Sequence, residues 1–268
     1  MKEQLSDKEL KQLKTSFDII GDIIVIEIPK ELRKKEKIIA DALRKTHPHV
    51  KTILKKIGER EGKFRLRKFK KIFGEETETI HKEYGCIFKL DVTKVYFSPR
   101  ESTERQRVAE KIKPNEKILV MFAGVGPYAI IIAKKQPSVK VYAIEINPDA
   151  VKYMIENVRM NKVGDRVIPI LGDVAKKSED FYGKCDRVIM PLPKGAYKYL
   201  KYAIKCAKPG GVIHFYYWAK EEDLFSECVD FIEKTAKKMG RKIEIVDKRK
   251  VLPYGPRKWK ICVEFICL

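Results

Sequence analysis

Cysteine motifs, long apolar runs and acidic residues are all scarce in this chain of 268 residues. The six cysteines include no C-x-x-C pair and have no paired histidine nearby, so we expect reduced thiols and no metal site. The N-terminus is polar, and the apolar runs are far shorter than the ~20 residues that a membrane-spanning helix needs. We therefore expect a cytoplasmic protein that is neither secreted nor membrane-spanning.

Acidic residues are too few to balance the basic ones. Lysine and arginine number 58 against 37 acids, which gives a net charge of +21. A surface adapted to heat would explain both the lysines and the scarcity of asparagine and glutamine, but such surfaces normally carry matching glutamate. The surplus therefore favours a polyanionic partner, and nucleic acid is the first candidate.

Length and hydrophobic periodicity predict two domains of unequal size. Short apolar segments broken by charge predict a small α+β domain over residues 1–92. Over residues 93–268 the pattern becomes strand, turn and helix in alternation, which predicts an α/β domain with a doubly wound, mostly parallel sheet. Its strands are expected at residues 117–122, 139–144, 166–170, 187–190, 212–218, 242–246 and 260–267.

A glycine turn follows the first strand of the predicted sheet. Gly124 and Gly126 let the backbone turn tightly and approach a ligand, and Pro127 suits the first position of a helix. Glu145 ends the next strand 19 residues after Gly126, where a carboxylate can accept the ribose hydroxyls of a nucleotide-like ligand. Both NAD and S-adenosylmethionine fit this pattern.

The ends of the third and fourth strands separate the two cofactors. Asp173 follows the third strand, where its carboxylate can accept the adenine amino group, and Pro191 begins the segment after the fourth. A single mononucleotide-binding half whose strand ends carry candidate ligand-binding residues favours S-adenosylmethionine over NAD. The alternative for Asp173 is an ordinary helix N-cap.

Four segments give the chain a resemblance to a known family: residues 96–100 (YFSPR), 102–105 (STER), 121–127 (MFAGVGP) and 190–196 (MPLPKGA). Together they resemble the archaeal and eukaryotic tRNA (guanine-N1) methyltransferases, which act on guanosine 37 beside the anticodon. The resemblance covers about residues 17–268. It implies a class I Rossmann-like methyltransferase sheet, S-adenosylmethionine as cofactor, the tRNA anticodon loop as partner and a monomer. We expect the further small N-terminal domain found in many members to be missing.

The resemblance also implies roles for individual residues. Methylation at N1 of guanine needs a base for the N1 proton and a cation near O6. Glu104 matches the family's base, and Arg65 matches its O6-stabilising arginine, with Arg67 as the alternative. Residues 102–105 would otherwise be a helix start with a capping carboxylate and a surface arginine. Cofactor contacts are expected from Arg105, Phe122, Gly124, Gly126, Glu145, Ile146, Asp173, Val174 and Pro191.

Pro191 departs from the family, which usually has asparagine there. Without that side-chain amide the pocket discriminates less between bases. We therefore hypothesise a second activity, C7 methylation of the tricyclic wyosine precursor 4-demethylwyosine at the same position. Two other interpretations stay open. One is the aminocarboxypropyl transferase of the wybutosine pathway, and the other is a non-catalytic tRNA-binding module.

Two basic segments are candidates for contacting RNA. Residues 60–71 alternate lysine and arginine with Phe64 and Phe69, which suits phosphate binding and base stacking, although an exposed edge strand would look similar. Residues 254–260 (YGPRKWK) form a second basic aromatic segment. The aromatic run at 214–218 (HFYYW) favours core packing instead, because it alternates within a central strand. The expected RNA contacts are Arg67, Lys68, Lys70, Lys71, Tyr96, Arg100, Arg257 and Lys258.

Overall fold

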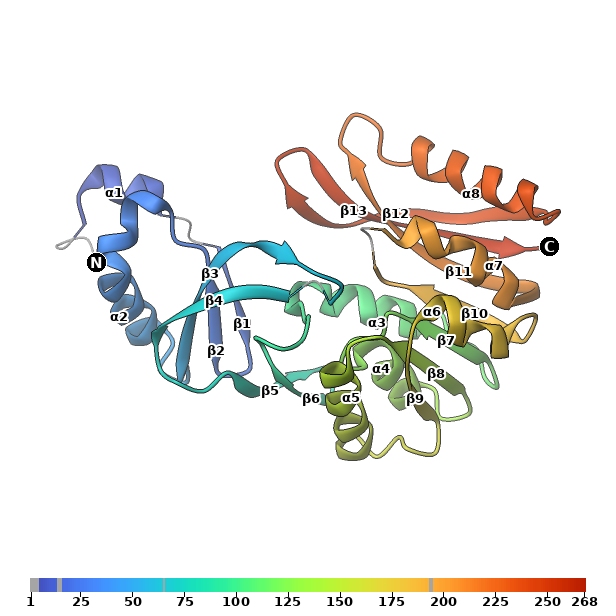
Figure 1. Cartoon of the computed structure of the whole chain (residues 1–268), viewed down its shortest axis with the longest axis horizontal. Coiled ribbons are helices and arrows are strands. Elements are labelled where there is room, and N and C mark those ends of the chain that lie inside the picture. Colours follow the sequence, from blue (N-terminus) through green and yellow to red (C-terminus); the bar gives the residue numbers. More distant parts are fainter. Residues whose placement is uncertain (1–4, 14–15, 65, 193–194) are drawn as a thin grey trace. The chain divides into compact units, whose positions relative to one another are not determined.

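A computed structural model of the chain describes residues 5–13, 16–64, 66–192 and 195–268, and only the backbone of residues 59–61. The chain divides into two compact units, Met1–Arg100 and Glu101–Leu268 (Figure 1). The division falls after Arg100 instead of after residue 92. The segment between these residues packs within the first unit, where the ring of Phe97 contacts those of His81 and Phe88. Each unit is described by itself below.

The first unit contains a four-stranded sheet with the order β1-β2-β3-β4 and a separate two-stranded sheet, β5-β6. In the larger sheet β2 and β3 are parallel, and the other pairs are antiparallel. One face of α2 is apolar, and Ile39 and Ala40 of that helix pack with Ile24, Ile26 and Ile53 of the sheet. The elements are α1 (Asp7–Gln12), β1 (Phe17–Ile20), β2 (Ile23–Ile26), the 3-10 helix η1 (Lys30–Lys35), α2 (Glu36–Thr46), β3 (Thr52–Glu61), β4 (Leu66–Phe73), β5 (Glu78–Glu83) and β6 (Cys86–Asp91).

The second unit contains a seven-stranded sheet with the order β12-β13-β11-β10-β7-β8-β9. The five strands from β11 to β9 in that order are parallel, and β13 runs antiparallel to both of its neighbours. The 3-10 helix η2 (Pro99–Glu101) contains the division between the units. The elements of the second unit are α3 (Ser102–Glu110), β7 (Lys117–Met121), α4 (Pro127–Lys135), β8 (Lys140–Glu145), α5 (Pro148–Met160), β9 (Val167–Leu171), α6 (Val174–Lys177), η3 (Ser178–Phe181), β10 (Cys185–Met190), η4 (Ala196–Tyr199), α7 (Leu200–Cys206), β11 (Ala207–Lys220), α8 (Ser226–Lys238), β12 (Ile243–Gly255) and β13 (Lys258–Cys267).

Helices cover this sheet as a doubly wound fold requires. Side chains of α7 and α8 form one core cluster with Leu119, Val188, Ile213 and Phe215 of the central strands. The helices α4 and α5 pack on β8 and β9 (Figure 1). The chain leaves β7 toward β8 on one side and later returns to β10 on its other side. The strand order therefore reverses between β7 and β10, and ligands of such sheets bind at the carboxyl ends of the strands beside that point.

The predicted α/β sheet is confirmed, and the largest differences concern strands that carry little apolar alternation. β12 continues to Gly255, beyond the expected residue 246, because backbone pairing with β13 maintains a mostly exposed edge strand through the charged segment 247–250. β5 was not expected, because half of its side chains are exposed and give no clear apolar pattern. Backbone pairing with β6 maintains it as a strand. All six cysteines are buried free thiols. No helix among the described residues is long and apolar enough to cross a membrane.

Candidate functional site

The turn between β7 and α4 has the backbone that the glycine pattern predicts. Phe122, Gly124 and Gly126 have φ of 59°, 56° and 88°, all in the left-handed region. A Cβ atom added to Gly126 would lie 2.8 Å from Cγ of Met154, so the turn has no room for a side chain there. The ring of Tyr199 packs edge-on against Phe122, with centroids 5.1 Å apart. The turn is therefore tight, and an aromatic pair lies beside it.

Glu145 at the end of β8 fixes this turn. Its Oε2 accepts the N–H of Gly124 at 2.8 Å, and its Oε1 accepts the N–H groups of Ile146 and Asn147, each at 2.8 Å. A carboxylate offers about four acceptor positions. Within the described part of the chain this leaves about one position on Oε2, which suits a hydroxyl group of a ligand.

Asp173 follows β9 and is the N-cap of α6, as the simpler interpretation predicted. Its Oδ1 accepts the N–H of Ala175 at 2.9 Å. Burial raises the pKa of Tyr199, and the negative charge of Asp173 raises it further. Val174 is buried in the core, which leaves only its backbone to meet a ligand.

The loops after β7, β8 and β9 thus bring a glycine turn and two carboxylates to the carboxyl ends of three adjacent strands. The turn gives close backbone approach, and Glu145 and Asp173 supply hydrogen-bond acceptors. This set fits the adenosine part of a nucleotide-like cofactor. Pro191 follows β10, and its carbonyl oxygen accepts a hydrogen bond from Nζ of Lys260 at 3.2 Å. Two residues of its motif, Pro193 and Lys194, lie outside the described residues.

Glu104 is a buried residue of α3, with 5% of its surface exposed. Its Oε1 accepts hydrogen bonds from Nη2 of Arg107 and the hydroxyl of Tyr216, both at 2.6 Å, and its Oε2 accepts Nε of Arg107 at 2.9 Å. The alternative of a capping carboxylate with a surface arginine is wrong. Glu101 is the N-cap and makes no side-chain capping bond, and Arg105 is 2% exposed.

Behind Glu104 lies a buried ionic network that the sequence did not indicate. Arg107 also donates to Oε1 of Glu264, and Lys111 donates to Oε2 of Glu264 at 2.8 Å. Nδ1 of His214 lies 3.3 Å from Glu264 without hydrogen-bond geometry, and its Nε2 lies 2.7 Å from Nη1 of Arg187. Burial would raise the pKa of Glu264, but its contacts with His214, Lys111 and Arg107 hold that pKa far below its usual range.

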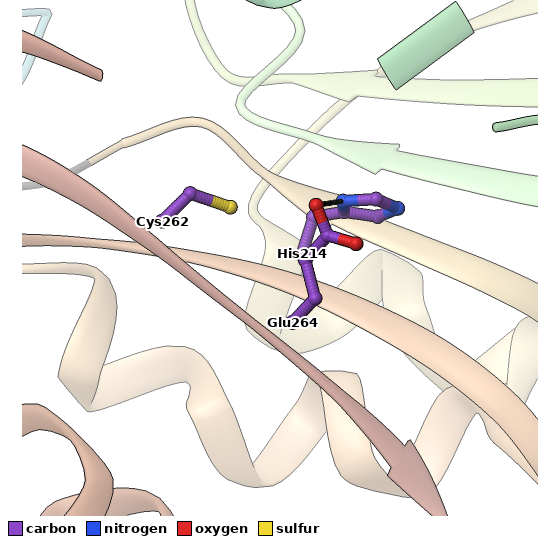
Figure 2. A group of neighbouring side chains, drawn as sticks. All are labelled: His214, Cys262 and Glu264. Carbon is purple, nitrogen blue, oxygen red and sulfur yellow. Dashed lines mark ion pairs between the residues drawn. The ribbon is translucent and has the colours of Figure 1, made fainter. Parts of the chain in front are cut away.

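The side chains of His214, Cys262 and Glu264 are the one group among the described residues that resembles a set of metal ligands (Figure 2). Their ligand atoms lie within 4.8 Å of one another. Both oxygens of Glu264 already accept hydrogen bonds from cations, and Arg187 is next to His214. Further positive charge is unfavourable in such surroundings. The group therefore belongs to the ionic network and gives no ground for a metal site.

The expected RNA contacts of β4 lie on an edge strand of the first unit. Nζ of Lys70 lies 2.7 Å from Glu36, and Nζ of Lys71 lies 3.1 Å from Glu75, so both charges are partly balanced. Lys68 is exposed. These lysines are accessible, but ion pairing reduces what they offer to a phosphate.

Arg67 and Tyr96 share a small pocket of about 50 Å³ in the same unit. Nε of Arg67 is buried and has no hydrogen-bond partner among the described residues. The side chain of Tyr96 is 40% exposed. Arg100 pairs with Asp18, which also lines this pocket. Arg65 lies outside the described residues, so the structure does not choose between it and Arg67.

Arg257 and Lys258 are exposed at the turn between β12 and β13 in the second unit. Arg257 has a φ of 53°, and its carbonyl accepts the N–H of Glu221 at 3.0 Å. Nearby, the rings of Trp218 and Tyr254 pack with centroids 4.0 Å apart. The second basic aromatic segment is therefore the tip of a hairpin.

Comparison with known proteins gives two family matches that together span most of the chain. The TRM5/TYW2 methyltransferase domain matches residues 79–246, and the TYW2 N-terminal domain matches residues 1–77. A protein of Pyrococcus abyssi named tRNA (guanine(37)-N(1))-methyltransferase Trm5b is 46% identical over 260 residues, which cover 96% of this chain and 77% of that protein.

Two further relatives carry other names. One from Nanoarchaeum equitans, named tRNA (guanine(37)-N(1))/4-demethylwyosine(37)-methyltransferase Taw22, is 35% identical over 92% of this chain and 97% of its own length. One from Pyrococcus horikoshii, named tRNA(Phe) (4-demethylwyosine(37)-C(7)) aminocarboxypropyltransferase, is 31% identical over 98% of this chain and 93% of its own length.

Solved structures of related proteins are also similar to the structure of this chain. The crystal structure of Trm5b from Pyrococcus abyssi has a TM-score of 0.89 at 45% identity and covers 98% of this chain and 78% of that one. The structure of P. horikoshii TYW2 in complex with MeSAdo has a TM-score of 0.83 at 29% identity, over 99% and 95% of the two chains. Together with the glycine turn, Glu145 and the buried Glu104, these matches establish that the chain belongs to the TRM5/TYW2 methyltransferase family.

Proposed function

We propose that this protein transfers a methyl group from S-adenosylmethionine to N1 of guanosine 37 in the anticodon loop of tRNA. The observation that carries the proposal is Glu104, a buried carboxylate held on α3 by Arg107 and Tyr216. The names of the relatives support the same substrate, and one related structure is a complex of aTrm5 with tRNALeu, at 35% identity and a TM-score of 0.86 over 99% of this chain and 75% of that one.

Glu104 would accept the N1 proton, which must leave before that nitrogen can attack a methyl group. Oε1 already accepts two hydrogen bonds. Among the described residues Oε2 accepts one, from Nε of Arg107, and Nε of Arg249 lies 3.9 Å from Oε2, beyond hydrogen-bond distance. The remaining acceptor position on Oε2 is the natural place for the proton. Arg107 and Tyr216 then serve to fix the direction in which that position points.

An arginine of the basic segment 60–71 would stabilise the negative charge that develops on O6. The family resemblance favours Arg65. The pocket that Arg67 shares with Tyr96, together with the unpartnered Nε of Arg67, supports the alternative.

The cofactor would be held by backbone groups at Gly124 and Gly126 and by the carboxylates of Glu145 and Asp173. When bound, S-adenosylmethionine supplies an activated methyl group on a sulfonium. The open acceptor position of Glu145 suits a ribose hydroxyl, and the aromatic pair Phe122 and Tyr199 gives an apolar wall beside the turn.

The proposal is tested by single-turnover methyl transfer from labelled S-adenosylmethionine to a tRNA transcript with guanosine 37. Glu104→Gln should lower the rate by about 100-fold or more, the usual contribution of a general base. Glu110→Gln is a matched control, because Glu110 is an exposed residue of the same helix. Full activity of Glu104→Gln would refute its role, and equal labelling of a transcript with adenosine 37 would refute the substrate.

A second substrate, 4-demethylwyosine at the same tRNA position, is supported by Pro191. Proline offers no side-chain amide to select guanine, and the Nanoarchaeum relative is named for both activities. Incubation with tRNA that carries 4-demethylwyosine should give its C7-methylated product. Lack of any product would restrict the enzyme to guanosine, and a gain of an aminocarboxypropyl group would favour the activity of the P. horikoshii relative.

A further inference from the structure

Lys260 is a buried lysine of β13, with only 1% of its surface exposed. Its Nζ lies 2.9 Å from Oε2 of Glu101 and 3.2 Å from the carbonyl oxygen of Pro191. Removing an ammonium group from water is costly unless charge and hydrogen bonds compensate for it. Lys260 is therefore committed to these two partners, which belong to different segments of the second unit.

The first partner leads to Glu104. Glu101 is the N-cap of α3, so it lies one helical turn before Glu104 on the same helix. Nζ of Lys260 also lies 4.7 Å from the ring centroid of Tyr216, whose hydroxyl donates to Glu104 at 2.6 Å. Lys260 thus contacts both the helix that carries Glu104 and the phenol that orients it.

The second partner is the loop that follows β10. Pro191 begins this loop at the carboxyl end of β10, beside the point where the strand order reverses. A hydrogen bond to its carbonyl oxygen fixes the backbone, whatever side chain the position carries. Because proline offers no polar side chain, a backbone contact of this kind is the hydrogen bond that Lys260 can make with Pro191.

We propose that Lys260 is a positioning residue that holds Pro191, at the carboxyl end of β10, and the start of α3 in one arrangement, and so sets Glu104 relative to Pro191. The inference rests on the proposed function, since it assigns Lys260 to the alignment of the base in that reaction. Alignment is a large part of catalysis, and a displacement of about 1 Å can cost 100-fold in rate.

The test uses the full-length protein with Glu101→Gln and Lys260→Met combined. Removing both charges avoids leaving a buried carboxylate unpaired, so this variant should fold where Lys260→Met alone is destabilised. Lys238→Met, an exposed lysine of α8, is the matched control. Calorimetry gives the dissociation constant of S-adenosylmethionine and the fraction of sites that bind it, and single-turnover assays with tRNA give the rate per occupied site.

We expect the double variant to bind S-adenosylmethionine with the full number of sites but to transfer methyl groups about ten- to 100-fold more slowly per site, as misalignment predicts. A rate per occupied site within about twofold of wild type would overturn the proposal, and so would a loss of activity fully explained by fewer binding sites. Absence of transfer by the wild-type protein would instead refute the proposed function, and the role of Lys260 with it.

Discussion

At the scale of single residues, the ionic network around Glu264 makes stability depend on pH. The contacts with His214, Lys111 and Arg107 lower the folded-state pKa of Glu264, although burial opposes them. A carboxyl whose pKa is lower in the folded state stabilises the fold above its unfolded pKa of about 4.3. That contribution is lost as the pH falls from there toward the folded value.

Glu264→Gln should therefore be less stable at pH 7, by about 1.5–3 kcal/mol, because Arg107 and Lys111 each lose one charged hydrogen-bond partner and keep only Glu104 and Asp247. Its free energy of unfolding should also fall less steeply than that of wild type between about pH 5 and pH 3. Urea denaturation at pH 7, pH 5 and pH 3 measures the free energy of unfolding of the two proteins. The control is Glu244→Gln on β12, where the side chain is exposed. Parallel pH curves for wild type and Glu264→Gln would contradict the assignment.

The motif made Glu104 a candidate base, but it gave no indication of the residues that hold its side chain. Tyr216 is 112 positions away in the sequence, and the pairing of β11 with β13 also places His214 opposite Glu264. The interpretation of the aromatic run as core holds for His214, Phe215 and Tyr216, which are fully buried. Tyr217 and Trp218 are only half-buried. Alternation along a strand shows that a residue faces inward, whereas it carries no information about which distant polar group it will meet.

At the scale of elements, the turn from β7 to α4 depends on Gly126. Alanine there would combine a φ of 88° with a Cβ 2.8 Å from Met154. We expect Gly126→Ala to cost about 1–3 kcal/mol of stability and to weaken binding of S-adenosylmethionine.

Gly183→Ala is the matched control for this turn. Gly183 has a φ of 66°, but nothing lies within 4 Å of an added Cβ, so only the backbone strain remains. Thermal unfolding and calorimetry compare the two variants. Equal losses of stability and unchanged cofactor binding would show that the close packing of the turn is unimportant.

The strand β4 gives a prediction about RNA binding. Replacing Lys68, Lys70 and Lys71 by methionine should lower the slope of log affinity for tRNA against log salt concentration. Each lost phosphate contact contributes about 0.9 on duplex and about 0.7 on single strands. Because Lys70 and Lys71 are ion-paired, we expect a total change of less than about 2.

The control for β4 replaces Lys234, Lys237 and Lys238 of α8, which removes the same charge elsewhere. Filter binding at several salt concentrations gives both slopes. If the slope falls equally in the two triple variants, β4 has no special role in binding RNA.

At the scale of the whole molecule, the alternation of strands and helices was enough to predict the doubly wound sheet, and the glycine turn indicated the edge of that sheet where the cofactor is expected. The prediction was weakest where backbone pairing determines structure without apolar alternation, as in β5 and the second half of β12. The excess positive charge indicated a polyanionic partner, in agreement with a tRNA substrate. How much of that charge is available to phosphate groups depends on ion pairs such as Lys70 with Glu36, which join segments far apart in the sequence.

The central claim is that this molecule methylates N1 of guanosine 37. The most direct measurement is mass spectrometry of nucleosides released from tRNA after incubation with the protein and S-adenosylmethionine. The expected product is 1-methylguanosine at that position, with one added methyl group. Unmodified guanosine 37, or a methyl group found elsewhere in the tRNA, would contradict it.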